Sequence, residues 1–295
     1  MCAIKKQGNV LKKLNVKISL YWKLIKSLQT GLLLATGLAG FMSFKCPVFN
    51  LPVLTGVAVS LFLTISGSTV LNMWYDRDID AKMARTCFRP LASGEVSSKE
   101  ALALGMILSI VGVGLALIMD PLFGFIVFLG IFFDVIIYTI WLKRRTCWSI
   151  IWGGLAGGMP ILAGRTLAVG TIDWVGILLA IGILFWIPTH IMTFSMRYHK
   201  DYLAAEIPTF PIQYNFSFTR LMIAFSSILA AITMGAASIG IGMTIGYLRL
   251  LIVLSMGLVF LALISLVKPS EKLNFGLFKY ASLYMLSAMV LMMLF

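Results

Sequence analysis

Acidic residues, cysteine and histidine are all scarce in this sequence. It has 11 acidic residues, four cysteines and two histidines among 295 positions, and charged residues make up only 12% of the chain. Soluble domains carry about 25% charged residues, so an ordinary water-soluble globular protein is excluded. The cysteines form no CxxC motif and no paired spacing, which argues against a metal cluster or a disulfide framework; they are Cys2, Cys46, Cys87 and Cys147.

Long apolar segments take the place of the missing charge. Hydrophobic residues make up 60% of the chain, and the mean hydropathy is +0.98. A helix needs about 20 apolar residues to cross a bilayer. The sequence therefore predicts an all-α integral membrane protein, with a basic arm at 1–27 and a single transmembrane domain at 28–295. Nine spans are expected, at 28–44, 51–75, 100–118, 121–141, 149–167, 172–193, 218–243, 247–267 and 274–295.

The net charge of +13 is concentrated on alternate loops. All basic residues except Lys45, Arg165 and Arg249 fall in the N-terminal tail or in the loops after the second, fourth, sixth and eighth predicted helices. Under the positive-inside rule these segments are cytoplasmic. We therefore expect a multi-pass protein of the plasma membrane, or of the mitochondrial inner membrane in a eukaryote. The expected partner of the basic charge is anionic lipid rather than nucleic acid.

Most of the acidic residues lie in two of the cytoplasmic loops, and the first loop contains a regular pattern. Asn72, Asp76 and Asp80 stand four residues apart, so on a helix they share one face. Mg²⁺ usually binds one or two carboxylates together with substrate phosphates. These three residues are therefore candidate metal ligands. The alternative is that the acids only solvate the loop and pair with nearby cations.

Cations follow directly after the acidic residues, at Lys82, Arg85 and Arg89. Arg85 and Arg89 are four residues apart, so they too could share a face. The planar guanidinium group suits bidentate contact with phosphate. Carboxylates for Mg²⁺ beside arginines for oxyanions predict a diphosphate site. The alternative is that the arginines only set the topology at the headgroup region.

The loop after the sixth predicted helix contains a second group of polar residues. Pro188-Thr189-His190 is expected to end that helix near the cytoplasmic mouth, and Lys200-Asp201-Tyr202 follows in the loop. A lone buried histidine is more often a satisfied core residue than a ligand. The fifth predicted helix carries Gly153, Gly154, Gly157 and Gly158, a pattern typical of closely packed membrane helices.

Residues 72–91 begin with N-x-x-x-D-x-x-x-D and end with R-x-x-x-R-P-L, and they resemble the first motif of the UbiA-superfamily prenyltransferases. Pro188-Thr189-His190, Asp201-Tyr202 and Ile207-Pro208 are similar to the second motif. Within the superfamily the chain is most similar to the branch that farnesylates protoheme IX, the heme O synthases. The resemblance covers roughly residues 23–215. It departs from the family at Lys200, where an acid is common.

The resemblance implies a nine-helix bundle whose central cavity opens to the cytoplasm and to lipid. It implies Mg²⁺, as two ions bridging a diphosphate, and farnesyl transfer from farnesyl diphosphate to the vinyl group of heme b, a substrate rather than a cofactor. Expected further partners are a downstream heme A synthase or oxidase assembly factors. The implied metal ligands are Asn72, Asp76, Asp80 and Asp201; the diphosphate ligands are Lys26, Lys82, Arg85, Arg89, Lys143, Lys200 and Tyr202; and the catalytic residues are Asp76, Asp80, Asp201 and His190.

Two other functions remain open at this stage. One is a UbiA enzyme that prenylates a quinone precursor or a glycerol-phosphate lipid. Such an enzyme does not need the P-x-H element before the second loop. The other is a secondary transporter, which would place its ionisable site near the middle of the bilayer. In this chain Asp134 is the one acidic residue in the middle of a predicted span, and the other acids lie at helix ends or in loops.

Overall fold

The computed structural model describes residues 15–44 and 50–295, and within these ranges the secondary structure is helical with no strand. Residues 1–14 of the predicted basic arm, with Cys2, Cys46 and Lys45, lie outside the described residues. The helices are α2 (Ser27–Met42), α3 (Leu51–Tyr75), α4 (Arg77–Lys82), α5 (Ser98–Met119), α6 (Pro121–Ile131), the π-helix η1 (Phe132–Leu142), α7 (Ser149–Val169), α8 (Trp174–Arg197), α9 (His199–Ala204), α10 (Phe210–Gln213), α11 (Phe216–Ile241), α12 (Ile245–Val267) and α13 (Glu271–Leu294).

Seven helical segments are long and apolar enough to cross a membrane: α3, α5, α6 continued by η1, α8, α11, α12 and α13. The helix Asn15–Leu24 and α2, bent by 58° at their junction, form a candidate for an eighth span. Helix α7 matches the remaining predicted segment with 21 residues. Many large apolar side chains are exposed on the outside, including Ile118, Met256 and Phe260, as expected for a lipid-facing surface. The chain is a multi-pass membrane protein, and the count of nine spans stays a prediction.

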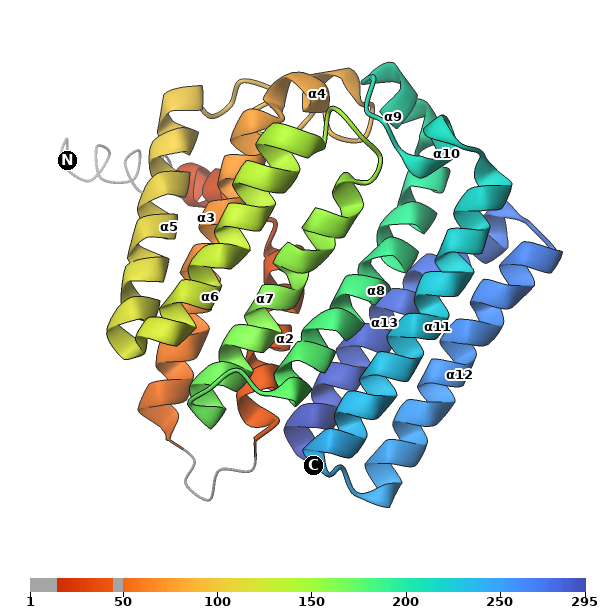
Figure 1. The fold of residues 1–295 in the computed structure, drawn as a ribbon. Coiled ribbons are helices and arrows are strands. Elements are labelled where there is room, and N and C mark those ends of the chain that lie inside the picture. The colour runs from red at the N-terminus through yellow and green to blue at the C-terminus, as the bar shows by residue number, and fades with distance from the viewer. Residues whose placement is uncertain (1–14, 45–49) are drawn as a thin grey trace, which may run out of the picture.

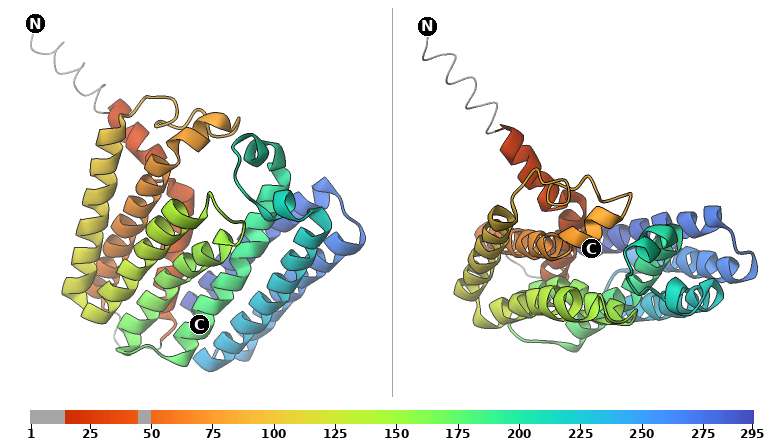
Figure 2. Two further views of the ribbon diagram at one scale, coloured as in Figure 1. Left: turned by 45° about the horizontal axis from the view of Figure 1, so that its top comes forward. Right: turned by 90° about the horizontal axis from the view of Figure 1, so that it is seen from above.

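The long helices follow one another around a closed circuit. Each packs against the next one along the chain, and α13 returns to α2 (Figures 1 and 2). Three contacts also cross the circuit: α2 with α7, α8 with α13, and α3 with α6 and its continuation η1. The four helices α2, α7, α8 and α13 therefore join the two halves of the bundle.

Polar residues in the connecting loops fix where the helices begin. The side chains of six residues accept a hydrogen bond from the backbone N–H three positions further on, which satisfies a donor that the first helical turn leaves free. Helices α7 and α11 end at glycines with φ of 84° and 80°, a conformation that other residues adopt only with strain. The six capping residues are Asn50, Ser97, Asp120, Asp173, Asn215 and Ser270.

Glycine lets α2 and α7 approach each other closely at the end far from the acidic loops. A Cβ atom on Gly164 would collide with the carbonyl oxygen of Gly37, and one on Gly40 would collide with that of Ile161. Helix α7 packs on α8 in the same way, since a Cβ on Gly158 would lie 2.8 Å from the Ala180 carbonyl oxygen. The packing predicted for the glycine-rich fifth helix is confirmed.

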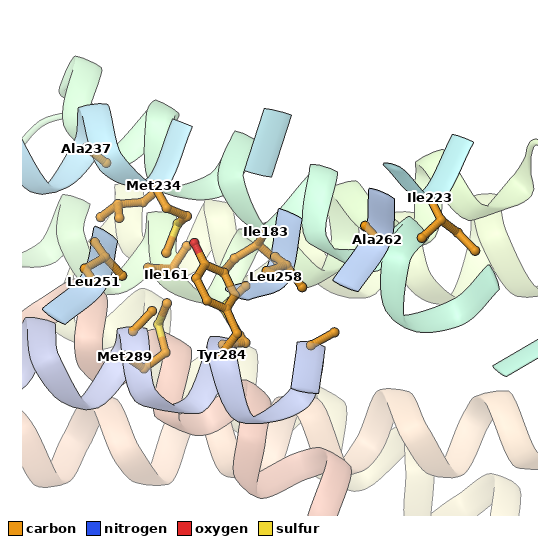
Figure 3. Packing of buried hydrophobic residues seen from close by; sticks show 14 of the residues in the cluster. Ile161, Ile183, Ile223, Met234, Ala237, Leu251, Leu258, Ala262, Tyr284 and Met289 are labelled. Carbon is orange, nitrogen blue, oxygen red and sulfur yellow. The ribbon is translucent and has the colours of Figure 1, made fainter. Parts of the chain in front are cut away.

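The largest apolar core lies between α7, α8, α11, α12 and α13 (Figure 3). Tyr284 is fully buried in it, and its hydroxyl lies 3.2 Å from that of Ser255, so the one polar atom of the ring is satisfied. Met234 and Met289 pack in the same core from α11 and α13. This core makes the C-terminal half a rigid support for α8.

Two loops gather at one end of the bundle. Figure 1 shows α4, α9 and α10 together at this end. Ile79 and Met83 from the first acidic loop pack against Ala205 and Ile207 from the second, with Tyr202 beside them. The two polar loops, more than 100 residues apart in sequence, therefore form one surface at the membrane edge.

Candidate active site

The backbone stacks Asn72, Asp76 and Asp80 on one face although the helix is interrupted. Helix α3 ends at Tyr75 and α4 begins at Arg77, yet helical hydrogen bonds continue across the junction. The N–H of Asp76 donates to the Asn72 carbonyl at 3.0 Å, and that of Asp80 donates to the Asp76 carbonyl at 2.8 Å. Both carboxylates are buried, with 3% and 5% of each residue exposed. The single face predicted from the spacing is present.

The negative charge of Asp76 is balanced by basic side chains of the loop that follows η1. The Lys143 ammonium forms an ion pair with Oδ2, and an Arg144 nitrogen lies 4.0 Å from Oδ1. Burial alone would lower the pKa of Lys143, but the nearby Asp76 carboxylate outweighs it and raises that pKa, so Lys143 stays charged. Oδ1 of Asp76 is buried and accepts no hydrogen bond from the described residues.

Asp80 is neutralised by Arg89. One guanidinium nitrogen of Arg89 lies 2.8 Å from both carboxylate oxygens. The hydroxyl of Thr86 donates to the backbone carbonyl of Asp80 at 2.9 Å, which folds the turn carrying Arg89 back over α4. Each buried carboxylate of the stack thus has its own cation.

The orientation of the Asn72 amide is fixed from within the membrane. Its NH₂ group donates to the Thr139 hydroxyl at 2.7 Å, and that hydroxyl donates its single hydrogen to the Asp134 carbonyl at 2.7 Å. Thr139 can therefore only accept from Asn72, and the amide oxygen must point away from it. Ser68 donates to the Asp134 carboxylate at 2.5 Å. Sequence reasoning missed Thr139 and Ser68, although Asp134 was visible as an isolated mid-helix acid.

The oxygen atoms at this face fit Mg²⁺. Asp76 Oδ1 has no hydrogen-bond donor among the described residues, and the Asn72 amide oxygen is likewise free to accept. The described part of the chain has no cluster of three or more histidine, cysteine or acidic side chains that could hold a metal ion unaided. Mg²⁺ takes few protein ligands and completes its shell with phosphate and water, so a short set of hard oxygens is the arrangement it requires.

Arg85, in the first loop, makes its contacts with the second loop rather than with the acidic stack. Its backbone N–H lies 3.4 Å from Asp201, and its side chain donates to the Tyr202 hydroxyl at 3.2 Å. The expectation that Arg85 and Arg89 share a helix face is wrong, because α4 ends at Lys82 and the backbone between the two arginines forms turns, with the Arg89 N–H donating to the Thr86 carbonyl at 2.9 Å. The described contacts of Asp201 are to Arg85, not to Asp76 or Asp80.

The other predicted cations differ in their surroundings. Lys26 lies between the helix Asn15–Leu24 and α2 and interacts electrostatically with Asp76, Asp80, Lys143 and Arg89. Lys82 and Lys200 are exposed and make no ion pair with the described residues.

Arg144 was missed by sequence reasoning, although it stands in a run of three basic residues. It binds both oxygens of Asp78 at 2.8 and 2.7 Å, and this pairing lowers the pKa of Asp78. Asp78 itself is largely exposed and faces away from the buried stack. Arg144 therefore anchors the first loop to the loop after η1.

His190 lies inside α8, not at its end as expected. The helix accommodates Pro188 and continues to Arg197. Membrane helices tolerate proline because side chains satisfy the backbone groups that it frees. In soluble proteins a proline inside a helix usually kinks or ends it, and on that basis the helix was expected to end near His190.

The aromatic row on α8 connects His190 to the polar loops. Its members, Trp186, His190, Phe194 and Tyr198, recur every fourth residue and so share one helix face. The guanidinium of Arg85 lies 4.8 Å from the Phe194 ring centre and 5.4 Å from that of Tyr198. A continuous aromatic surface therefore runs from Arg85 of the first loop to the imidazole within the membrane.

Comparison with known proteins identifies the family of the chain. Residues 33–283 match the model of the UbiA prenyltransferase family. The chain is 42% identical to the protoheme IX farnesyltransferase of Korarchaeum cryptofilum over 74% of this chain and 73% of that protein. It is 39% identical to the protein of the same name from Archaeoglobus fulgidus, over 80% and 82% of the two chains.

Solved structures share the fold at low identity. One is a digeranylgeranylglyceryl phosphate synthase, with a TM-score of 0.78 and 19% identity over 94% of this chain and 97% of that one. Another is a UbiA homolog from Archaeoglobus fulgidus bound to GPP and Mg²⁺, with a TM-score of 0.71 and 15% identity over 92% and 99% of the chains.

Proposed function

The chain belongs to the UbiA prenyltransferase family, and we propose that it transfers the farnesyl group of farnesyl diphosphate to a vinyl group of protoheme IX, forming heme O. Relatives that carry the name protoheme IX farnesyltransferase support this choice of donor and acceptor. The observation that carries the chemistry is the buried stack of Asp76 and Asp80. Each carboxylate is paired with a cation, and Oδ1 of Asp76 accepts no hydrogen bond from the described residues.

The charges at the site suit a diphosphate anion. Lys26, Arg85, Arg89 and Lys143 supply four positive charges around the carboxylates of Asp76, Asp80 and Asp201. A metal-bound carboxylate no longer needs its cation, so Lys143 and Arg89 become available to the phosphate oxygens. Arg85 reaches from the first loop to Tyr202 on the second, and both would contact the diphosphate from that side.

Bond cleavage requires that the leaving diphosphate be stabilised. Mg²⁺ held by Asn72, Asp76 and Asp80 would neutralise charge that develops on the bridging oxygen. The C–O bond breaks with both electrons passing to the diphosphate, and Arg89, Lys143 and Arg85 stabilise this anion through charge-assisted hydrogen bonds. The allylic cation then takes the electron pair of the vinyl group, and water adds to the carbocation left on the porphyrin side chain and loses a proton to solvent, giving the hydroxyethylfarnesyl product. Apolar walls keep water from the allylic cation before it is captured.

Architecture and orientation are part of the same proposal. We expect nine spans to enclose a cavity that opens at the end where the two polar loops meet, with that end and the N-terminus in the cytoplasm. The glycine-mediated contact of α2 with α7 at the far end favours an opening on the side of the loops. Two Mg²⁺ ions would require Asp201 to leave Arg85, which a bound diphosphate could replace as the partner of that arginine.

The test is a mass-spectrometric assay of purified protein with farnesyl diphosphate, heme b and Mg²⁺. Asp76→Asn and Asp80→Asn should each lower the turnover number by about 100-fold or more, the usual effect of removing one stabilising group from a transition-state anion site. Asp78→Asn is the matched control, because Asp78 is exposed and pairs with Arg144 outside the stack. Wild-type turnover by either buried variant would contradict the site, and the absence of a farnesyl adduct from wild-type protein would contradict the function.

A further inference from the structure

The hydrogen bonds of Ser282 favour one tautomer of His190. The Ser282 hydroxyl has a single hydrogen, and a carbonyl can only accept. Ser282 lies 3.1 Å from the carbonyl oxygen of Phe278 and 3.2 Å from Nδ1 of His190. When the hydroxyl hydrogen goes to the carbonyl, Nδ1 must carry the proton and donate it to the serine oxygen. The lone pair of the neutral imidazole is then on Nε2.

Aromatic rings hold the imidazole in place on both faces. The ring of Trp186 lies 4.9 Å from the His190 ring with an angle of 23° between their planes, and the ring of Phe278 lies 4.6 Å away at 25°. Trp186 is itself anchored by a hydrogen bond of 2.8 Å from its indole N–H to the Ala281 carbonyl. Since both faces are covered and Nδ1 is occupied, the Nε2 edge is the part of the ring that remains for a ligand.

Nε2 makes no hydrogen bond with the described residues, and it is not among the fully buried polar atoms that lack a partner. A histidine that served only to fill the core would be expected to use both nitrogens. The combination seen here, with one nitrogen donating to a fixed acceptor and the other left open, is the arrangement that protein ligands of metal ions adopt.

We propose that Nε2 of His190 is an axial ligand of the iron of the acceptor porphyrin, and that Ser282 is the positioning residue that holds its tautomer and ring orientation. This deepens the proposed function and rests on it for the identity of the porphyrin. The aromatic row between His190 and Arg85 connects the iron site with the diphosphate loops. Iron ligation would fix the plane of the macrocycle and bring a vinyl group to the farnesyl donor.

The experiment compares binding of heme b with binding of iron-free protoporphyrin IX to purified protein in detergent. Wild-type protein should bind heme b at least about 10-fold more tightly, and His190→Ala should abolish this preference. Ser282→Ala should weaken heme binding by about 10–100-fold and shift its Soret band, the usual cost of losing the partner of a metal-bound histidine. Ser282→Thr keeps the hydroxyl and should restore most of the affinity and the band position.

Ser287→Ala is the matched control, since this serine lies on the same helix and makes no hydrogen bond with the described residues. It should behave as wild type, and calorimetry should give the same affinity for farnesyl diphosphate in all variants. Equal binding of heme and protoporphyrin by the wild type overturns the proposal, whether or not Ser282→Ala folds. Unchanged heme affinity and Soret band in folded Ser282→Ala overturn the role of Ser282.

Turnover separates this inference from the function on which it rests. An enzyme that forms heme O without any preference for iron contradicts the inference and leaves the proposed function intact. A protein that binds iron through His190 and Ser282 but forms no farnesyl adduct supports the inference and contradicts the proposed function.

Discussion

Lys143→Met should destabilise the protein through Asp76, and a metal ion should reverse the effect. The Asp76 side chain is 4% exposed and that of Lys143 19%, so the pair is largely desolvated. Removing one partner of a buried ion pair typically costs about 3–5 kcal/mol. Arg144 remains 4.0 Å from the other oxygen, but its side chain is 34% exposed and already bound to Asp78, so its compensation is small. We expect a loss of about 2–4 kcal/mol in the free energy of unfolding.

The assay is thermal unfolding of purified protein, measured with a chelator and again with Mg²⁺ and a non-reactive farnesyl diphosphate analogue. The gain in melting temperature from Mg²⁺ should be larger for Lys143→Met than for wild type, because the metal replaces the missing counter-charge of Asp76. Because the pKa of Lys143 is raised, its ammonium and the stability it contributes persist as the pH rises. The difference between variant and wild type should therefore stay constant from neutral pH to about pH 10, near the ordinary lysine pKa.

Arg145→Met is the matched control, since Arg145 is exposed two residues further on and has no ion pair with the described residues. It should unfold like wild type with or without Mg²⁺. The reasoning is refuted if Lys143→Met is as stable as wild type in chelator, or if Mg²⁺ and the analogue stabilise both proteins equally.

Three further changes test other parts of the structure. Thr139→Val removes the acceptor that orients the Asn72 amide and should weaken Mg²⁺ binding in calorimetry by about 10-fold, whereas Thr139→Ser should not; equal affinities would mean that the amide is not a ligand. Arg85→Lys loses the planar contact with aromatic rings and should raise the KM for farnesyl diphosphate by about 10-fold; unchanged kinetics would limit Arg85 to a structural role. Gly164→Ala should lower the free energy of unfolding by about 1–3 kcal/mol through overpacking, while Gly114→Ala, which has open space around it, should not; equal thermal stability would contradict the close α2–α7 contact.

Local spacing made the acidic stack predictable. Residues four apart share a helix face whether the segment is one helix or two joined in register, so Asn72, Asp76 and Asp80 stayed together across the break at Asp76. The partners of these acids were not predictable in the same way. Lys143 was expected at the site only because of the family resemblance. Its contact with Asp76 depends on packing between segments 67 residues apart, which local spacing does not reveal.

Two predictions were wrong because the sequence did not show where a helix ends. Arg85 and Arg89 separate because α4 stops after six residues, which no apolar periodicity in a short polar segment could reveal. His190 lies within α8 because a membrane helix passes through Pro188 where a soluble helix would often stop. Thr139 and Ser68 are ordinary-looking residues whose importance depends on which face of η1 meets α3.

The acceptor preference of the purified enzyme tests the central claim most directly. Farnesyl diphosphate and Mg²⁺ would be supplied with equal concentrations of heme b and 4-hydroxybenzoate, and the products would be separated by liquid chromatography and identified by mass spectrometry. A protoheme IX farnesyltransferase should yield a porphyrin carrying one farnesyl group and one added hydroxyl, with the phenolic acid unchanged. Prenylated 4-hydroxybenzoate with unmodified heme would contradict the proposed acceptor and leave only the membership of the UbiA family.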